Sequence, residues 1–130
     1  MPLYQFTITK GSRSSQRKNE IAKAITKAHC DVTGAPARYV NVFFTEVAED
    51  DIYIAGEPVS GTRMVGIVRR RTEEQNRKLL MALGEGWASA TGEPLKDVVM
   101  AIVEIPGYQA LEDGVLLGEA EDDDKLVGAH

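Results

Sequence analysis

The sequence has a single cysteine and no long apolar run. Cys30 is the only cysteine among 130 residues, so an internal disulfide is excluded and a reducing compartment fits. No stretch approaches the roughly 20 apolar residues of a membrane-spanning helix, and the first residues lack the basic and apolar regions of a signal peptide. We therefore expect a cytoplasmic protein that does not bind membranes.

Basic residues are also in the minority. The chain has 15 Lys and Arg against 20 Asp and Glu, a formal net charge of −5. This balance does not favour non-specific nucleic-acid binding, although a local arginine cluster can still bind a small anion. The hydrophobic share of 43% and the length of 130 residues suit one globular domain.

Two segments resemble each other at a spacing of 58 residues. The stretch TGAPARYVNVFFTEV begins at Thr33, and TGEPLKDVVMAIVEI begins at Thr91. The same spacing matches further pairs of like residues, namely Gly34 with Gly92, Pro36 with Pro94, and Arg13 with Arg71. We interpret the chain as a tandem of two similar units at about 2–47 and 60–105.

Each unit is predicted to form a strand, a helix and a second strand. The segment LYQFTIT mixes aromatic and β-branched residues, as strands do. Ser14 is a candidate cap for the first helix, and Thr72 with Gln75 has the capping-box pattern at the second. A glycine and a proline follow each helix and end it. The expected strands are 3–9, 39–47, 62–68 and 96–105, and the expected helices are about 15–32 and 73–90.

Two such units with right-handed crossovers predict an α+β fold, a four-stranded sheet with both helices on one face. The other face carries alternating apolar residues, so we expect a homo-oligomer in which sheets pack together. Residues 1–118 are predicted to be a single domain. The acidic tail at 119–130 is expected to be mobile or to lie on a neighbouring subunit. The IYI stretch between the units is expected to form a short edge strand.

Pro2 is the first candidate site residue. A small residue at position two permits removal of Met1, which would leave a secondary amine at the chain terminus. Taken alone, a proline at the start of a strand is more often structural. In paired βαβ units the start of the first strand can face the end of the third, where the arginines lie. Their charge would lower the pKa of the amine below its ordinary value of about 7.7–8.0 and make it a base.

Three consecutive arginines, Arg69, Arg70 and Arg71, lie between a strand and a helix N-terminus. Guanidinium groups bind carboxylates in a paired, directional manner, and the helix N-terminus adds free N–H groups and a positive dipole end. The cluster is therefore a candidate anion site. The alternative is a solvated turn with surface ion pairs.

His29 and Glu112 are weaker candidates by themselves. His29 falls on or beside the apolar helical face, where a buried core histidine is the ordinary interpretation. Glu112 lies in a loop after the last strand, where most carboxylates are solvated. No metal site is apparent, because His29, Cys30 and Asp31 point in different directions on a helix. No cofactor motif is present either, since the glycines do not form a phosphate-binding loop.

Together these features resemble the tautomerase superfamily, and within it the cis-3-chloroacrylic acid dehalogenase family. The matching pieces are PLY at the start, AKAITKAH ending at His29, RTEEQ at the second helix, VEIP at 103–106 and LEDG around Glu112. The resemblance extends to about Gly118. It implies a homotrimer that uses an amino-terminal proline, here Pro2, as its catalytic group.

The resemblance also implies roles for the other candidates. Arg69 and Arg71 fall on the two carboxylate-binding arginines, with Arg70 as a substitute for one of them. His29 falls on a histidine that helps to bind the substrate carboxylate or carbonyl. Glu112 falls on the glutamate that activates water in the dehalogenases.

One position departs from this family's pattern. The water-activating tyrosine falls on Ala101, which has no hydroxyl, and Tyr108 in the following turn is the other nearby source. A related malonate semialdehyde decarboxylase shares the arginine-x-arginine and EEQ pattern but expects an aspartate where APARY has none. We therefore expect a tautomerase for small 2-oxo or enol carboxylic acids such as phenylpyruvate. The alternatives are a cis-3-haloacrylate dehalogenase or hydratase, and a non-catalytic trimeric binding protein.

Overall fold

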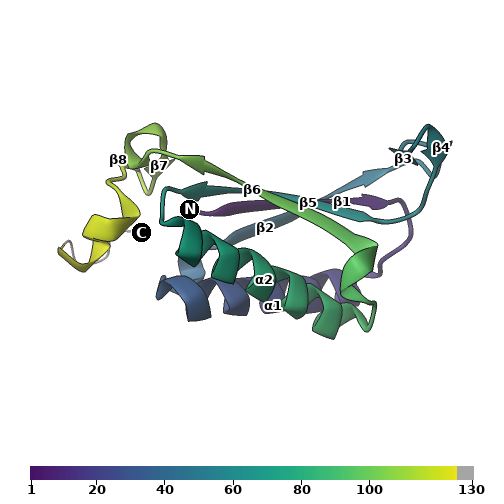
Figure 1. Ribbon diagram of the computed structural model, residues 1–130, viewed down its shortest axis with the longest axis horizontal. Helices are drawn as coiled ribbons and strands as arrows, with labels where there is room; N and C mark the ends of the chain where they lie inside the picture. Colours follow the sequence, from purple (N-terminus) through teal and green to yellow (C-terminus); the bar gives the residue numbers. More distant parts are fainter. Residues whose placement is uncertain (126–130) are drawn as a thin grey trace.

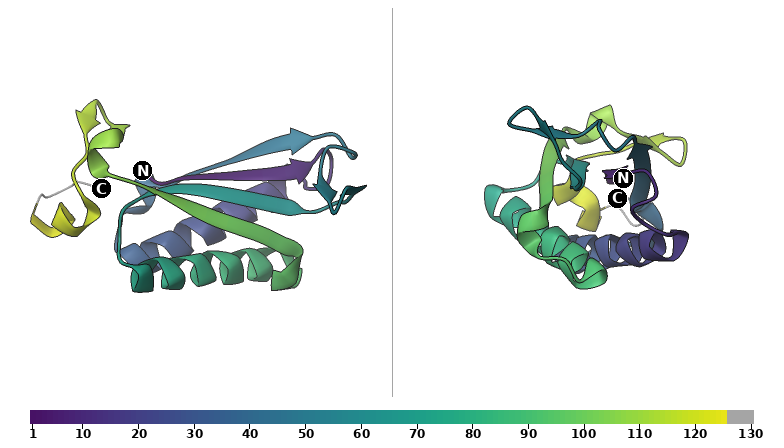
Figure 2. Two further views of the ribbon diagram at one scale, coloured as in Figure 1. Left: turned by 45° about the horizontal axis from the view of Figure 1, so that its top comes forward. Right: turned by 90° about the vertical axis from the view of Figure 1, so that its right-hand side faces the viewer.

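The computed structural model describes residues 1–125 and confirms the α+β fold with a four-stranded sheet (Figure 1). The main elements are β1 (Leu3–Thr9), α1 (Ser15–Thr33), β2 (Asn41–Val47), β5 (Thr62–Arg69), α2 (Glu73–Thr91) and β6 (Val98–Ile105). The strand order is β2-β1-β5-β6, with β1 parallel to β2, β5 parallel to β6, and the two central strands antiparallel. Both helices cover the same face of the sheet (Figure 2).

Shorter elements connect and follow the main ones. Two hairpins are formed by β3 (Tyr53–Ile54) with β4 (Glu57–Pro58) and by β7 (Leu111–Glu112) with β8 (Val115–Leu116). Short 3-10 helices are η1 (Ala37–Tyr39), η2 (Leu95–Asp97), η3 (Gly107–Gln109) and η4 (Ala120–Lys125). The 58-residue spacing extends through the helices, the first two 3-10 turns and both hairpins, so the repeat is longer than the sequence comparison indicated.

Three local expectations are wrong. The IYI stretch pairs with β4 in a separate hairpin, so it is not an edge strand of the main sheet. The second and fourth strands begin at Asn41 and Val98, two residues later than expected in each case. The residues before them form η1 and η2, because Pro36 and Pro94 end the preceding loops and direct the chain into a 3-10 turn.

The helix ends agree with the capping signals in the sequence. The side chain of Ser14 accepts a hydrogen bond from the Arg17 backbone N–H, and Thr72 forms a reciprocal capping box with Gln75. Gly34 and its counterpart Gly92 follow the helices in the left-handed conformation, with φ of 76° and 72°. Glycine adopts this conformation without steric cost, so each helix ends just before the glycine at the same position of the two repeats.

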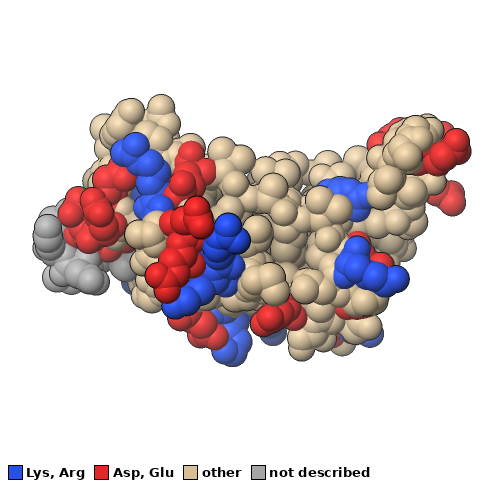
Figure 3. Space-filling model, viewed as in Figure 1, with Lys and Arg blue, Asp and Glu red and all other residues tan. Residues whose placement is uncertain are grey.

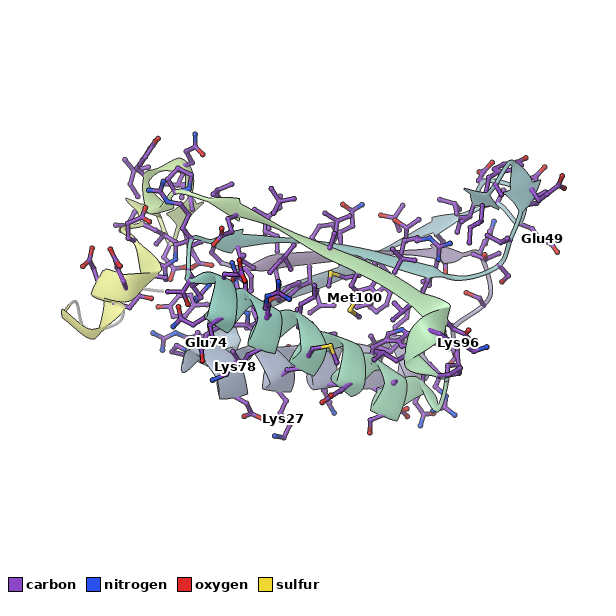
Figure 4. All side chains as sticks on the ribbon, viewed as in Figure 1. Lys27, Glu49, Glu74, Lys78, Lys96 and Met100 are labelled. Atoms are coloured by element: carbon purple, nitrogen blue, oxygen red, sulfur yellow. The ribbon has the colours of Figure 1, made fainter. Side chains whose placement is uncertain are left out.

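The core lies between the sheet and the helices. Its largest members, Tyr4, Phe6 and Trp87, have no exposed surface. Met100 of β6 points toward the helices, whereas Lys27 and Lys78 point away from the sheet (Figure 4). Within residues 1–125 no helix is both long and apolar enough to cross a membrane.

The opposite face of the sheet carries apolar side chains that no part of residues 1–125 covers. These side chains are Leu3 (36% exposed), Phe43 (43%), Val65 (49%), Val99 (55%) and Val103 (51%). They come from all four main strands, so the apolar surface extends across the whole sheet.

The tail turns back on its own chain in the part that is described. Residues Ala120–Lys125 form η4, and Asp123 pairs with Arg69 of β5. The remaining tail, 126–130, lies outside the described residues, and the domain boundary near Gly118 stays a prediction.

Candidate active site

The amino terminus lies at the arginine end of the sheet. Antiparallel pairing of β1 with β5 sets Leu3 opposite Ile67, two residues before Arg69. The Met1 ammonium donates to the Tyr39 carbonyl oxygen at 2.9 Å and pairs with the Glu112 carboxylate. With Met1 attached, the nitrogen of the next residue is an amide and has no basicity.

Pro2 is buried where β1 begins, with less than 2% of its side chain exposed. Its carbonyl oxygen accepts hydrogen bonds from both the backbone N–H and the side-chain amide of Asn41, each at 3.1 Å. These bonds to the start of β2 fix the position of the first residues.

Arg69 ends β5 and is 3% exposed. Its guanidinium donates to the Gly118 carbonyl oxygen at 2.7 Å and to both carboxylate oxygens of Asp123, at 3.0 and 2.5 Å. All of these acceptors come from the C-terminal segment.

The next two arginines face different surroundings. Arg70 is exposed and pairs with Glu119 at 3.1 Å. Arg71 is half-buried, and its guanidinium donates to the Arg69 carbonyl oxygen at 3.2 Å. Within the described part of the chain, no carboxylate forms an ion pair with Arg71. Burial and the charge of Arg69 lower the pKa of Arg71.

His29 is 1% exposed on the inner face of α1. Its Nδ1 lies 2.7 Å from the Tyr4 hydroxyl, and its Nε2 is buried without a hydrogen-bond partner among residues 1–125. Burial lowers the pKa of His29 to about 3, with further contributions from Arg71, the terminal amine and Arg69. The imidazole is therefore neutral, and three cations are close enough to act on it.

Glu112 comes from the β7–β8 hairpin, whose tight turn places Asp113 and Gly114 at positive φ. One carboxylate oxygen pairs with the Met1 ammonium, and the other is buried without a partner among the described residues. A carboxylate oxygen with spare accepting capacity beside an amine could hold a water molecule or a polar substrate atom.

A cavity of about 770 Å³ lies between the C-terminus of α1, the N-terminus of α2 and the tail. It is lined by Val32, Thr33, Gly34, Arg70, Arg71, Thr72, Gln75, Glu119, Ala120, Glu121 and Asp123. The structure thus joins two of the arginines in this cavity. The other candidates are not part of its lining: Pro2, His29 and Arg69 are buried, and Glu112 is half-buried.

The other end of the sheet has the equivalent positions of the repeat but not the same chemistry. The 58-residue spacing places Ser60 where Pro2 stands and Ile54 where Glu112 stands. Arg13, the counterpart of Arg71, is bound by the Glu93 carboxylate in a cavity of about 530 Å³. Among the described residues, only the amino-terminal end combines an amine, free cationic charge and a buried imidazole.

Sequence reasoning missed two side chains that touch the predicted ones. Tyr4, the partner of His29, was predictable as a core residue from the alternation of β1, but not as a hydrogen-bond partner. Asp123, the partner of Arg69, is one of several similar acids in the tail, and no local pattern distinguishes it. Ala101 lies on the outer sheet face opposite Val65, as its place in β6 requires.

Across residues 1–125 no group of three His, Cys, Asp or Glu side chains is arranged to hold a metal ion.

Comparison with solved structures agrees with this fold. The protein Ps01740 is 32% identical, with a TM-score of 0.78 over 85% of this chain and 99% of that one. A member of the cis-3-chloroacrylic acid dehalogenase family, N1, is 25% identical, with a TM-score of 0.87 over 94% and 87%. A fused 4-OT described as a symmetric trimer is 26% identical, with a TM-score of 0.79 over 92% and 96%. No curated protein matches the chain.

The family comparison covers almost the whole chain. The family model described as "Putative oxalocrotonate tautomerase enzyme" matches residues 1–124, which include both repeats, the hairpin that carries Glu112 and most of η4. The chain therefore belongs to this tautomerase family.

Proposed function

We propose that this chain is a tautomerase that catalyses keto–enol proton transfer on small 2-oxo or enol carboxylic acids such as phenylpyruvate. Removal of Met1 would leave the secondary amine of Pro2 as the base. The observation that carries the proposal is geometric: antiparallel pairing of β1 with β5 sets the amino terminus beside the arginine end of β5, and Tyr4 of β1 contacts the buried imidazole of His29. A site that concentrates positive charge suits an anionic substrate.

The same surroundings favour a neutral amine on Pro2. An ammonium close to two guanidinium groups is electrostatically unfavourable, and burial also disfavours the charged form. An α-amino group ordinarily has a pKa of about 7.7–8.0. A decrease of about one or two units would make Pro2 an unprotonated base at neutral pH, suited to proton transfer.

In this proposal each group has one role. Arg71 pairs with the substrate carboxylate, Arg69 adds a second positive charge, and the Nε2–H of His29 donates to the carboxylate or the 2-oxygen. Pro2 takes the proton of the enol hydroxyl, and the electrons of that O–H bond form the new C=O bond. The electron pair of the C2=C3 double bond then takes the proton from the Pro2 ammonium and forms the new C3–H bond, which regenerates the neutral amine. Arg70, which faces the cavity and solvent, is a substitute carboxylate contact at the entrance.

We also propose that the chain assembles as a homotrimer. The apolar outer face of the sheet supports this, because five side chains between 36% and 55% exposed cover it. The fused 4-OT structures similar to this chain include a symmetric and an asymmetric trimer.

Dehalogenation or hydration of 3-haloacrylates is the second candidate function. The free carboxylate oxygen of Glu112 beside the terminal amine favours it, because such a carboxylate can activate water. Two features count against it. Ala101 supplies no hydroxyl, and Tyr108 is 68% exposed in η3 and forms no hydrogen bond that would hold it in the site among the described contacts.

The test is ketonisation of phenylenolpyruvate, followed by absorbance, on protein whose intact mass shows that Met1 is absent. Pro2→Ala should abolish the activity, whereas Pro58→Ala, at an exposed proline of β4, should retain it. Glu112→Gln should affect turnover of 3-chloroacrylate more than ketonisation. Carboxylate binding without turnover, by protein with a free Pro2 amine, would overturn the enzyme proposal and indicate a binding protein.

A further inference from the structure

We propose that Asp123 is an internal carboxylate that occupies the ligand position on Arg69, so that residues 118–123 form a lid that a carboxylate ligand must displace. We call these residues the acidic segment. The inference rests on the proposed function only in taking Arg69 as part of the carboxylate site.

The contacts of Arg69 are those of an occupied carboxylate site. Both oxygens of Asp123 accept from the two terminal nitrogens of the guanidinium, at 3.0 and 2.5 Å. This paired geometry is the one with which arginine binds a ligand carboxylate. The Gly118 carbonyl oxygen accepts a further bond at 2.7 Å. Among residues 1–125, every acceptor of the Arg69 guanidinium, which is 3% exposed, therefore comes from the acidic segment.

The near end of the acidic segment is anchored close to the last strand. The Leu117 N–H donates to the Ala110 carbonyl at 2.9 Å, and Glu119 accepts from the Gly107 N–H at 2.6 Å. A β-carbon at Gly107 would lie 1.9 Å from the Gly118 carbonyl oxygen, so the two glycines pack in direct contact. The segment follows β8 and returns to the amino-terminal end of the sheet (Figures 1 and 2).

The far end is held by ion pairs near the surface. Asp123 is 17% exposed, and the second pair joins Arg70, 54% exposed, with Glu119, 28% exposed. Acidic and basic side chains lie next to each other at this end of the molecule (Figure 3). The Arg70–Glu119 pair is exposed and contributes little to stability. The Arg69–Asp123 pair is largely buried, so removal of Asp123 alone would leave a buried charge unpaired, whereas a ligand carboxylate that replaces Asp123 keeps the Arg69 guanidinium paired.

The cavity beside the acidic segment gives a ligand access to the arginines. Arg71 and Asp123 both line it, and Arg71 has no carboxylate ion-pair partner among residues 1–125. A ligand therefore meets Arg71 first, and displacement of Asp123 adds Arg69 as the second guanidinium. A ligand carboxylate can thus contact only Arg71 while Asp123 is bound to Arg69, and both arginines once Asp123 is displaced.

The test measures the affinity for phenylacetate, a monocarboxylate that the proposed reaction does not consume, by calorimetry on the full chain. Asp123→Asn should tighten binding about tenfold, as expected for the loss of one competing charged contact. Glu121→Gln is the matched control, because Glu121 lines the same cavity, is exposed, and carries the same charge. It should change the affinity less than twofold.

Two further variants separate direct competition from a general change of charge. In an Arg69→Gln background, Asp123→Asn should give no gain in affinity. Gly107→Ala, which leaves every charge in place, should tighten phenylacetate binding because its methyl group displaces Gly118. Equal gains in Asp123→Asn and Glu121→Gln, or a gain that persists without Arg69, would overturn the lid. Because binding is measured without turnover, an inactive protein that shows the expected affinities would refute the proposed function and leave the lid intact.

Discussion

The hydroxyl of Tyr4 lies 2.7 Å from Nδ1 of His29, and both side chains are buried. A neutral imidazole carries one N–H. If Tyr4 donates to Nδ1, the hydroxyl proton has an acceptor and the imidazole proton is on Nε2. The reverse arrangement leaves the hydroxyl proton without an acceptor among the described contacts. The first arrangement leaves Nε2–H without an acceptor among residues 1–125, and this is the donor that a carboxylate or enolate oxygen could accept from. We therefore expect Tyr4 to favour this tautomer when a ligand is bound.

Tyr4→Phe should keep the packing of β1 but remove the hydroxyl group that fixes the position of the His29 ring proton. We expect kcat/KM for phenylenolpyruvate to fall by about tenfold, because one oriented hydrogen-bond donor is worth about 1.4 kcal/mol. The nitrogen-15 shifts of the His29 ring should move from a single tautomer toward a mixture. Tyr53→Phe, at a tyrosine that is 55% exposed, is the control and should change neither quantity. Unchanged ring shifts in Tyr4→Phe would contradict the assignment.

The neutral state of His29 makes stability depend on pH. Its pKa is lowered to about 3 in the folded chain, against about 6.5 when unfolded. Between these values only the unfolded state binds the proton. The free energy of unfolding should therefore fall as pH decreases below about 6.5, by about 1.4 kcal/mol per pH unit from this group. Above that pH the group contributes no slope.

Urea unfolding at pH 5, 6 and 7 measures this effect, and His29→Gln should lack this share of the slope. Proton NMR gives a second measurement, because the chain has two histidines and His130→Gln identifies the other signal. A His29 ring signal that titrates near pH 6.5 in the folded protein would show that the imidazole is not held neutral.

The fold was predictable because its signals are local and repeated. The caps Ser14 and Thr72, the glycines that end both helices, and the alternation of the strands each follow from neighbouring residues. The tandem then limited the topology, since two similar βαβ units can share one sheet in few ways. The start of β2 was misplaced because the 3-10 turn after Pro36 has no apolar periodicity of its own.

The site was less predictable because it depends on pairing over long distances in the chain. Glu112 and the amino terminus are 111 residues apart, and Arg69 and Asp123 are 54 apart. No pattern in the neighbouring residues identifies such a pair. Only the three-dimensional structure shows which of the several acids in the tail contacts Arg69. The resemblance to a family supplied the expected roles of Pro2 and His29, but it supplied none for Tyr4, whose hydrogen bond to His29 follows only from the three-dimensional contact.

The outer sheet face offers a direct test of assembly. Val65→Asp places a charge in the middle of the apolar surface, and burying it between subunits would be costly. We expect the proposed trimer to dissociate to monomer, as measured by size-exclusion chromatography with light scattering. Met81→Asp on α2 is the control, because Met81 is 52% exposed and Val65 is 49% exposed. It should leave the assembly unchanged, and dissociation by both variants, or by neither, would contradict the proposed interface.

Gly66 of β5 packs closely against the ring of Tyr4, whose hydroxyl group contacts His29. A β-carbon at this position would lie 2.6 Å from Cδ1 of the buried Tyr4 ring, so the ring has to move to admit a methyl group. Gly66→Ala should lower the free energy of unfolding by about 1–3 kcal/mol, as overpacking does, and should disturb the ring shifts of His29. Gly61→Ala is the matched control, since its nearest neighbour is the flexible Arg63 side chain at 3.1 Å, and it should cost less than about 0.5 kcal/mol. If Gly66→Ala were as stable as the control with the His29 signals unchanged, the contact between Tyr4 and the imidazole would not depend on the close packing of β1 against β5.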